Sequence, residues 1–282
     1  MARQEKGPAF PPGHFYSPVA DPDEIDAART WPERPEVLGI DFNDAAHFEV
    51  LERDFPRFHP DYDYPDEGTE TPTLKAFFTN NSQFSWLDSR ALFVLLRAQP
   101  PRRIIEVGSG FSSLLMADVN RRWLGGEVEL CCIEPYPRPF LREGIPGLSR
   151  LIESRVQEVP LTEFARLRAG DILFIDSSHV AKTGSDVNFL FFEVMPRLAA
   201  GVRIHLHDIF LPHDYPQAWV LSENRSWNEQ YLLRALLMHT TAFEVLFGCS
   251  YAFWRFPESV AAALAHPDGA AYGGGSFWMR RV

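Results

Sequence analysis

The sequence predicts an α/β fold in which a doubly wound, seven-stranded, mostly parallel sheet follows an N-terminal extension of short helices and irregular segments. Beyond residue 100, short apolar runs alternate with stretches of helical periodicity, which is typical of parallel strands joined by helical crossovers. A glycine turn, Gly108-Ser109-Gly110, follows the first apolar run. Residues 1 to about 70 are instead rich in Pro, Asp and aromatic side chains. We therefore divide the chain into an extension at 1–100 and an α/β domain at 101–282.

The expected elements follow from periodicity and from turn residues. The extension contains short helices at 23–29 and 43–55 and a longer apolar helix at 86–96. The α/β part contains strands at 103–107, 127–133, 150–153, 171–175 and 202–207, and helices at 112–123, 186–198 and 228–238. Two last strands, 243–247 and 251–256, are separated by Gly248-Cys249-Ser250, which predicts a hairpin with an antiparallel strand at the sheet edge. The C-terminal Phe277-Trp278 pair is not assigned to a strand.

The composition is that of a globular protein and argues against several classes. The chain has 282 residues, 45% of them hydrophobic, which is enough for one large domain. The formal net charge of −11 disfavours nucleic acid as a partner. Three cysteines provide neither a disulfide framework nor a Cys-rich zinc site. Because no signal peptide and no long apolar run are visible, we expect a cytoplasmic protein without a membrane span; a homo-oligomer stays open.

The turn after the first strand has features of a nucleotide-cofactor site. Ligands of doubly wound sheets bind at the carboxyl ends of strands, where glycines and helix N-termini expose backbone N–H groups. Glu106 precedes the glycines, and its carboxylate can hold an ammonium group. Glu134 follows the next strand, where a carboxylate can accept hydrogen bonds from ribose hydroxyls. Ser113 replaces the third glycine of the dinucleotide pattern, which disfavours NAD.

These residues resemble the motifs of the class I methyltransferases, which bind S-adenosylmethionine on a Rossmann-like sheet. The sequence EVGSG at 106–110 resembles their motif I, Glu134 their ribose-binding acid and 171–176 their fourth-strand motif, so the resemblance covers about 102–256. It implies a methyltransferase that uses S-adenosylmethionine as cofactor. The implied cofactor contacts are Glu106, Gly108, Ser109, Gly110, Ser112, Glu134 and Asp176.

Two neighbouring strand ends each present a carboxylate and an imidazole. Asp176 and His179 follow the fourth strand, and His207 and Asp208 follow the fifth. Oxygen ligands suit Mg²⁺, while added imidazoles favour Mn²⁺, Fe²⁺ or Zn²⁺. The candidate metal ligands are therefore Asp176, His207 and Asp208. His205 lies on the same strand face as His207 at a different depth, and we expect it to be structural.

This pattern resembles the metal-dependent sugar O-methyltransferases of macrolide biosynthesis. The resemblance implies that Asp176 and Asp208 hold a divalent cation such as Mg, Mn or Fe, and that His179 is the catalytic base. A neutral imidazole can take the proton that an alcohol loses as its oxygen attacks a methyl group. This sequence departs from that family at His207, where the family has a glutamate. The expected acceptor is a hydroxyl of a small molecule, either a sugar or a polyhydroxylated natural product.

Two other functions stay open. A degenerate methyltransferase fold that serves as a binding or scaffolding subunit would be expected to lose the polar groups at the strand ends, which this chain keeps. An NAD-dependent oxidoreductase would need the third glycine, so Ser113 and Glu106 argue against it.

An aromatic segment follows Asp208 and includes Phe210, Trp219 and Trp227. It predicts either an acceptor pocket with a lid or packing under the extension. Residues 80–84 are expected at the opposite border of the same pocket.

Overall fold

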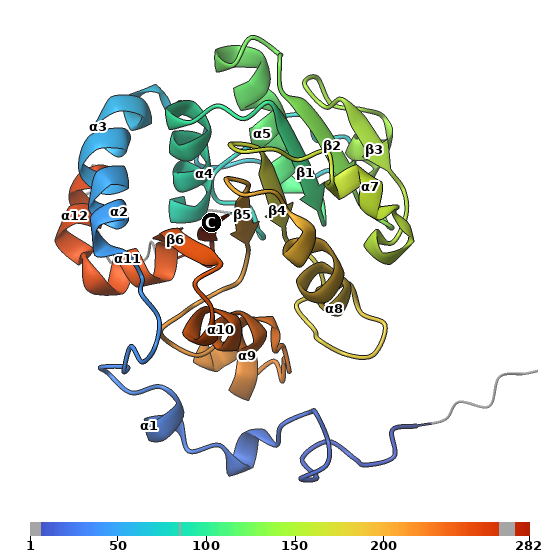
Figure 1. The fold of residues 1–282 in the computed structure, drawn as a ribbon, viewed down its shortest axis with the longest axis vertical. Helices are drawn as coiled ribbons and strands as arrows, with labels where there is room; N and C mark the ends of the chain where they lie inside the picture. Colours follow the sequence, from blue (N-terminus) through green and yellow to red (C-terminus); the bar gives the residue numbers. More distant parts are fainter. Residues whose placement is uncertain (1–6, 85, 265–273) are drawn as a thin grey trace, which may run out of the picture.

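The computed structural model describes residues 7–84, 86–264 and 274–282 and contains a seven-stranded sheet with helices on both faces (Figure 1). The strands are β1 Arg103–Val107, β2 Glu129–Ile133, β3 Arg150–Ile152, β4 Ile172–Ile175, β5 Arg203–Leu206, β6 Phe243–Gly248 and β7 Phe277–Arg281. Their spatial order is β3-β2-β1-β4-β5-β7-β6. Strands β1 to β5 pair in parallel, whereas β7 is antiparallel to both of its neighbours. The predicted doubly wound, mostly parallel sheet with antiparallel pairing near one edge is confirmed.

The predicted hairpin of 243–247 and 251–256 is wrong. Its first segment is β6, but Tyr251 and the residues after it lie in helix α11, Cys249–Arg255. The antiparallel partner of β6 is β7, which contains Phe277 and Trp278 and lies between β5 and β6. The aromatic content of 251–256 favours a strand locally, yet Tyr251 and Ala252 bury one face of a helix instead. Tertiary packing therefore overrides the local preference.

The helices account for most of the other predicted elements, but the single helix predicted at 23–29 is wrong, because extended Ile25 and Asp26 separate a 3₁₀ turn from a one-turn helix. The described helices are α1 Ala27–Thr30, α2 Asp44–Phe48, α3 Phe55–Phe58, α4 Trp86–Ala98, α5 Phe111–Trp123, α6 Pro139–Arg142, α7 Leu161–Phe164, α8 Asp186–Phe189, α9 Gln217–Leu221, α10 Glu229–His239, α11 and α12 Pro257–Leu264. Single turns of 3₁₀ type are η1 Pro22–Glu24, η3 His59–Asp61, η4 Val156–Glu158 and η6 Met195–Arg197, and π-type segments are η2 Glu49–Asp54 and η5 Leu190–Val194. The predicted helices at 43–55 and 186–198 are the continuous segments α2–η2–α3 and α8–η5–η6.

Both faces of the sheet are buried, each in its own hydrophobic cluster. On β4, Ile172 and Phe174 face the cluster that contains α4 and α5, whereas Leu173 and Ile175 face the cluster that contains α8 and α10. Strands covered on both faces are apolar at most positions, which explains why their sequences contain nearly continuous apolar runs. Helices from both predicted segments, 1–100 and 101–282, pack in the first cluster. The division at residue 100 stays a prediction.

The N-terminal segment crosses the outside of α9 and α10 (Figure 1). The indole N–H of Trp31 donates a hydrogen bond to the Tyr215 carbonyl oxygen at 2.7 Å, which fastens this segment to the loop before α9. Among the helices of the described residues, none combines the length and the apolar composition needed to cross a bilayer.

Candidate active site

The turn between β1 and α5 packs tightly against the end of β4. Gly108 adopts a φ of +80°, in the left-handed region where L side chains are strained. A Cβ atom at this position would lie 1.7 Å from the carbonyl oxygen of Asp176. Glycine is therefore required for the two strand ends to come this close, and the turn brings Ser109 and Gly110 beside the residues that follow β4.

Glu106 lies beneath this turn. Its Oε1 accepts a hydrogen bond from the Ser112 hydroxyl at 2.6 Å, and its Oε2 accepts from the Ser113 hydroxyl and, at 3.0 Å, from the Cys132 thiol. Burial raises the pKa of Glu106 to about 7. The Glu106 carboxylate thus stabilises the start of α5 through these hydrogen bonds, and it is not among the residues that line the neighbouring cavity. A contact between Glu106 and a cofactor ammonium group stays a prediction.

Glu134 stands directly after β2, where the sequence places it, and its side chain reaches the same turn. Its Oε2 accepts a hydrogen bond from the Ser109 N–H at 3.1 Å, and its Oε1 accepts from the Tyr136 N–H at 2.8 Å. Each carboxylate oxygen keeps a further lone pair that can accept a ribose hydroxyl. The carboxylate is therefore oriented by backbone groups before any ligand binds.

A cavity of about 730 Å³ opens above the carboxyl ends of the strands. The turn at 108–110 borders one side of this cavity, and the carboxylates and imidazoles that follow β4 and β5 border the other. Its lining consists of Ser82, Gln83, Phe84, Asp88, Gly108, Ser109, Gly110, Phe111, Ser112, Glu134, Tyr136, Arg138, Asp176, Ser177, Ser178, His179, His207, Asp208, Phe210, Trp219, Arg225, Trp227, Gly274 and Gly275. Both the aromatic segment after Asp208 and residues 82–84 border this cavity, which agrees with the pocket interpretation.

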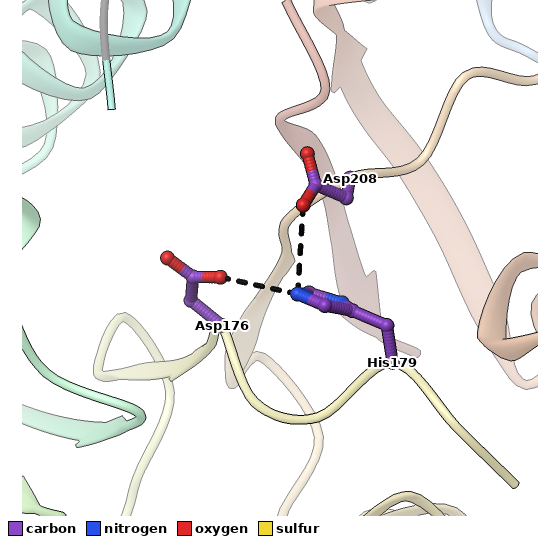
Figure 2. A group of neighbouring side chains, drawn as sticks. All are labelled: Asp176, His179 and Asp208. Atoms are coloured by element: carbon purple, nitrogen blue, oxygen red, sulfur yellow. Dashed lines mark ion pairs between the residues drawn. The ribbon is translucent and has the colours of Figure 1, made fainter. Parts of the chain in front are cut away.

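Asp176, His179 and Asp208 form a compact cluster in this cavity, shown in Figure 2. The Nε2 atom of His179 lies 3.5 Å from Asp176 Oδ1 and 3.5 Å from Asp208 Oδ2. On the other side, His207 Nδ1 lies 3.3 Å from Asp176 Oδ1 and 3.6 Å from Asp208 Oδ1. One pair of carboxylates is therefore flanked by two imidazole nitrogens, one from the loop after β4 and one from the end of β5.

The outer nitrogen of each imidazole contacts a further buried carboxylate. His179 Nδ1 lies 3.0 Å from Glu229 Oε2, at the start of α10, and His207 Nε2 lies 3.4 Å from Asp88 Oδ2, on α4. Neither Asp88 nor Glu229 was predicted from the sequence. Asp88 carried a usable signal, because it shares the apolar helical face of Leu92. A charged residue on a buried face needs a partner.

The charges of the cluster depend strongly on one another. Burial lowers the pKa of His179, but its hydrogen bonds to Asp176 and Glu229 more than offset this effect, and the pKa is raised to about 10. Burial also lowers the pKa of His207, but the charges of Asp176 and Asp208 and the hydrogen bonds to Asp176 and Asp88 together raise it well above its usual value. The two carboxylates therefore favour the protonated form of both imidazoles. A divalent cation and the protonated imidazoles would compete for the same two carboxylates, Asp176 and Asp208.

Two members of the cluster have strained backbones. His179 has a φ of +59° and Asp208 a φ of +56°, and they are two of only five non-glycine residues with positive φ in the described part of the chain. Such conformations cost on the order of 1–3 kcal/mol and concentrate at functional sites. The strain supports a functional role for this cluster.

An aromatic wall borders the cluster on the side of α9. The ring centroids of Trp227 and His179 are 4.5 Å apart. The ring centroid of Trp219 lies 5.3 Å from that of Trp227 and 5.3 Å from that of Phe210. The guanidinium of Arg225 lies over Trp219 at 4.2 Å and over Trp227 at 4.8 Å. These aromatic rings and the guanidinium over them therefore lie next to the polar cluster.

His205, in contrast, is a core residue, as expected. It is fully buried, its ring stacks on Phe174 at 3.7 Å, and its Nε2 lies 3.0 Å from the Ser276 hydroxyl. It is not among the residues that line the cavity.

Comparison with known sequences agrees with the motifs at the strand ends. A family model described as "Methyltransferase domain" matches residues 105–209. An uncharacterized protein of Archaeoglobus fulgidus is 40% identical over 173 residues, which is 58% of this chain and 76% of that protein.

Comparison with solved structures finds more distant likenesses. The SAH-bound methyltransferase PaMTH1 of Podospora anserina is 19% identical, with a TM-score of 0.44, over 84% of this chain and 88% of that chain. A putative O-methyltransferase of Klebsiella pneumoniae is 14% identical, with a TM-score of 0.40, over 83% and 89%. At these TM-scores the likenesses are too distant to assign a substrate or a metal.

Proposed function

Because the chain belongs to the class I methyltransferases, which use S-adenosylmethionine, we propose that it transfers the methyl group of this cofactor to a hydroxyl of a small molecule. The acceptor is a sugar or a similar polyhydroxylated compound, and a divalent cation assists the transfer. One observation carries this proposal: the glycine turn with Glu134 and the cluster of Asp176, His179 and Asp208 face one cavity.

The cofactor half of the cavity fits S-adenosylmethionine. Glu134 is oriented to accept the ribose hydroxyls, and the turn at 108–110 allows close approach of the ligand to the backbone. The hydroxyl of Ser177 is buried, lines the cavity and lacks a hydrogen-bond partner within the described structure. Buried polar atoms are usually satisfied, so this hydroxyl is a candidate for contact with the polar groups of the cofactor.

The donor set of the cluster fits a divalent cation. Asp176 and Asp208 supply anionic oxygens, and His207 supplies a nitrogen that faces both. When bound there, a cation would neutralise the two carboxylates, favour neutral imidazoles and acidify an acceptor hydroxyl. The mixture of oxygen and nitrogen donors is compatible with Mn²⁺, Fe²⁺ or Zn²⁺ as well as with Mg²⁺.

His179 is the proposed base. Glu229 holds its Nδ1, so that in the neutral ring the lone pair lies on Nε2, which faces the cavity. As the acceptor oxygen forms its bond to the methyl carbon, its proton passes to Nε2 and the bond between sulfur and methyl breaks. S-adenosylhomocysteine and the methyl ether are the products. Trp227, beside His179, and Arg225 over its ring line the cavity next to this base, where an aromatic ring and a cation can contact the acceptor.

The test begins with metal-stripped protein titrated calorimetrically with S-adenosylmethionine and S-adenosylhomocysteine, alone and with Mg²⁺ or Mn²⁺. A panel of sugars and polyols is then screened for S-adenosylhomocysteine formation. We expect Asp208→Ala to abolish metal binding. We expect His179→Gln to lower turnover by about 10²–10⁴-fold with cofactor and metal affinity unchanged. His239→Gln, at the exposed end of α10, is the matched control.

Absence of cofactor binding under all conditions would contradict the proposal. Cofactor binding without turnover on any acceptor would favour a binding subunit instead. Loss of metal affinity in His179→Gln would show that His179 is a ligand, because a base that does not touch the metal should leave that affinity intact.

A further inference from the structure

Asp88 is a buried carboxylate that reaches the cluster from outside the strand-end motifs. It lies on α4, before the residues that match the methyltransferase family model, and is only 6% exposed. An unpaired carboxylate at this depth would be strongly destabilising. The contacts of Asp88 therefore indicate what the carboxylate is for.

Both oxygens of Asp88 are held by the segment that leads into β7. Oδ1 accepts a hydrogen bond from the Ser276 N–H at 2.7 Å, and Oδ2 accepts from the Gly275 N–H at 3.1 Å. A Cβ atom at Gly275 would lie 2.7 Å from Asp208 Cα, so this segment packs directly against the cluster. The carboxylate of Asp88 is thus fixed in place by backbone groups.

The third contact of Asp88 is with His207. Its Oδ2 lies 3.4 Å from Nε2 of this imidazole, which is 4% exposed. A carboxylate can only accept, so in the neutral ring Nε2 carries the hydrogen and the lone pair lies on Nδ1. That is the nitrogen that faces Asp176 and Asp208. Histidines that bind metals commonly donate their other N–H to a carboxylate in this way.

We infer that Asp88 is a positioning residue that holds His207 in the tautomer and orientation of a nitrogen ligand, so that the centre prefers a transition-metal dication to Mg²⁺. This inference rests on the proposed function, because it takes the cation as given. It goes further in assigning a role to a residue outside the matched segment and a chemical class to the metal. A purely structural role, in which Asp88 only holds the 274–276 backbone, makes a different prediction.

The experiment measures Co²⁺, Mn²⁺ and Mg²⁺ affinity of the full chain by calorimetry and records the visible absorption of bound Co²⁺. Wild-type protein should bind Co²⁺ and Mn²⁺ more tightly than Mg²⁺. Asp88→Asn should lower Co²⁺ affinity by about 10–100-fold and alter the Co²⁺ spectrum. Asp171→Asn is the matched control, because Asp171 is also a buried carboxylate that accepts backbone N–H groups, but it lies just before β4, at the end of the strand away from the cavity. It should lower thermal stability and leave Co²⁺ affinity unchanged.

A double-mutant cycle with His207→Asn tests whether Asp88 acts through this imidazole. If it does, Asp88→Asn should have no further effect on Co²⁺ affinity once His207 is replaced. Asp88→Glu, which keeps the carboxylate, provides the comparison if Asp88→Asn does not fold, and it should retain more Co²⁺ affinity than His207→Asn.

Wild-type Co²⁺ affinity in Asp88→Asn, or additive losses in the double variant, would overturn the inference and leave the proposed function intact. A wild-type protein that binds S-adenosylmethionine but no dication would refute the inference and the metal part of the proposed function together.

Discussion

Replacement of Gly108 by alanine should destabilise the protein more than replacement of Gly110, the other glycine of the turn between β1 and α5. Two effects add. A non-glycine residue at its φ of +80° costs roughly 1–2 kcal/mol. The new Cβ would also lie 1.7 Å from the Asp176 carbonyl oxygen, whereas contact between such atoms needs roughly 3.5 Å. The ends of β1 and β4 would have to separate.

The displacement of Gly108 threatens two hydrogen bonds at the strand ends, one between β1 and β4 and one between Gly108 and β2. The Asp176 N–H donates to the Val107 carbonyl at 2.8 Å, and the Gly108 N–H donates to the Ile133 carbonyl at 3.0 Å. A buried group left without its partner costs about 1–3 kcal/mol. With the strain, Gly108→Ala should lose at least about 3 kcal/mol, a large part of the roughly 5–15 kcal/mol available to a typical domain.

Urea denaturation, followed by tryptophan fluorescence, measures this loss. Gly126→Ala is the matched control, because Gly126 has a φ of +72° and no atom lies within 4 Å of the place that its new methyl group would occupy. It should show the backbone strain alone, roughly 1–2 kcal/mol. If Gly108→Ala loses no more stability than Gly126→Ala, the close approach of the two strands does not explain the need for glycine, and the reasoning is refuted.

Two further predictions concern the cofactor and the extension. Glu134→Gln should weaken S-adenosylmethionine binding roughly 10- to 100-fold, since a hydrogen bond to a charged group contributes about 1.5–3 kcal/mol, with little change in melting temperature; equal affinity by calorimetry would contradict the assignment. His47 accepts the Gly248 N–H at 2.9 Å, and burial lowers its pKa below the usual value. Because the unfolded chain then binds a proton that the folded chain excludes, the stability contributed by neutral His47 should fall as the pH drops below about 6.5. In His47→Gln, which keeps an acceptor but does not titrate, stability should depend less on pH between about 7.5 and 5.5; parallel curves would contradict this.

Much of the fold was predictable because parallel strands buried on both faces have continuous apolar sequences. β1, β4 and β5 lie within two residues of their expected positions. Since the carboxyl ends of parallel strands share one edge, the positions of Glu134, Asp176 and Asp208 at the cavity followed as well. The helices around them were predictable from apolar periodicity.

The pairing of β7 was not predictable in the same way. Its partners, β5 and β6, come much earlier in the chain, and nothing local to Phe277 and Trp278 specifies a place between them. The aromatic residues of 251–256 favour a strand locally, but packing decided in favour of α11. Long-range pairing depends on the whole chain, which local propensity does not describe.

The sequence by itself determined the class of fold, the cofactor turn and the carboxylates at the strand ends, because each depends on neighbouring residues and on the common direction of parallel strands. Only the tertiary structure decided which groups complete the site. Asp88 contacts His207, and Glu229 contacts His179, although the two residues of each pair are far apart in the sequence. Each buried charge is therefore paired only once the chain has folded. The tertiary structure likewise placed one nitrogen of each imidazole next to Asp176 and Asp208 and the other nitrogen next to a second carboxylate, Glu229 for His179 and Asp88 for His207.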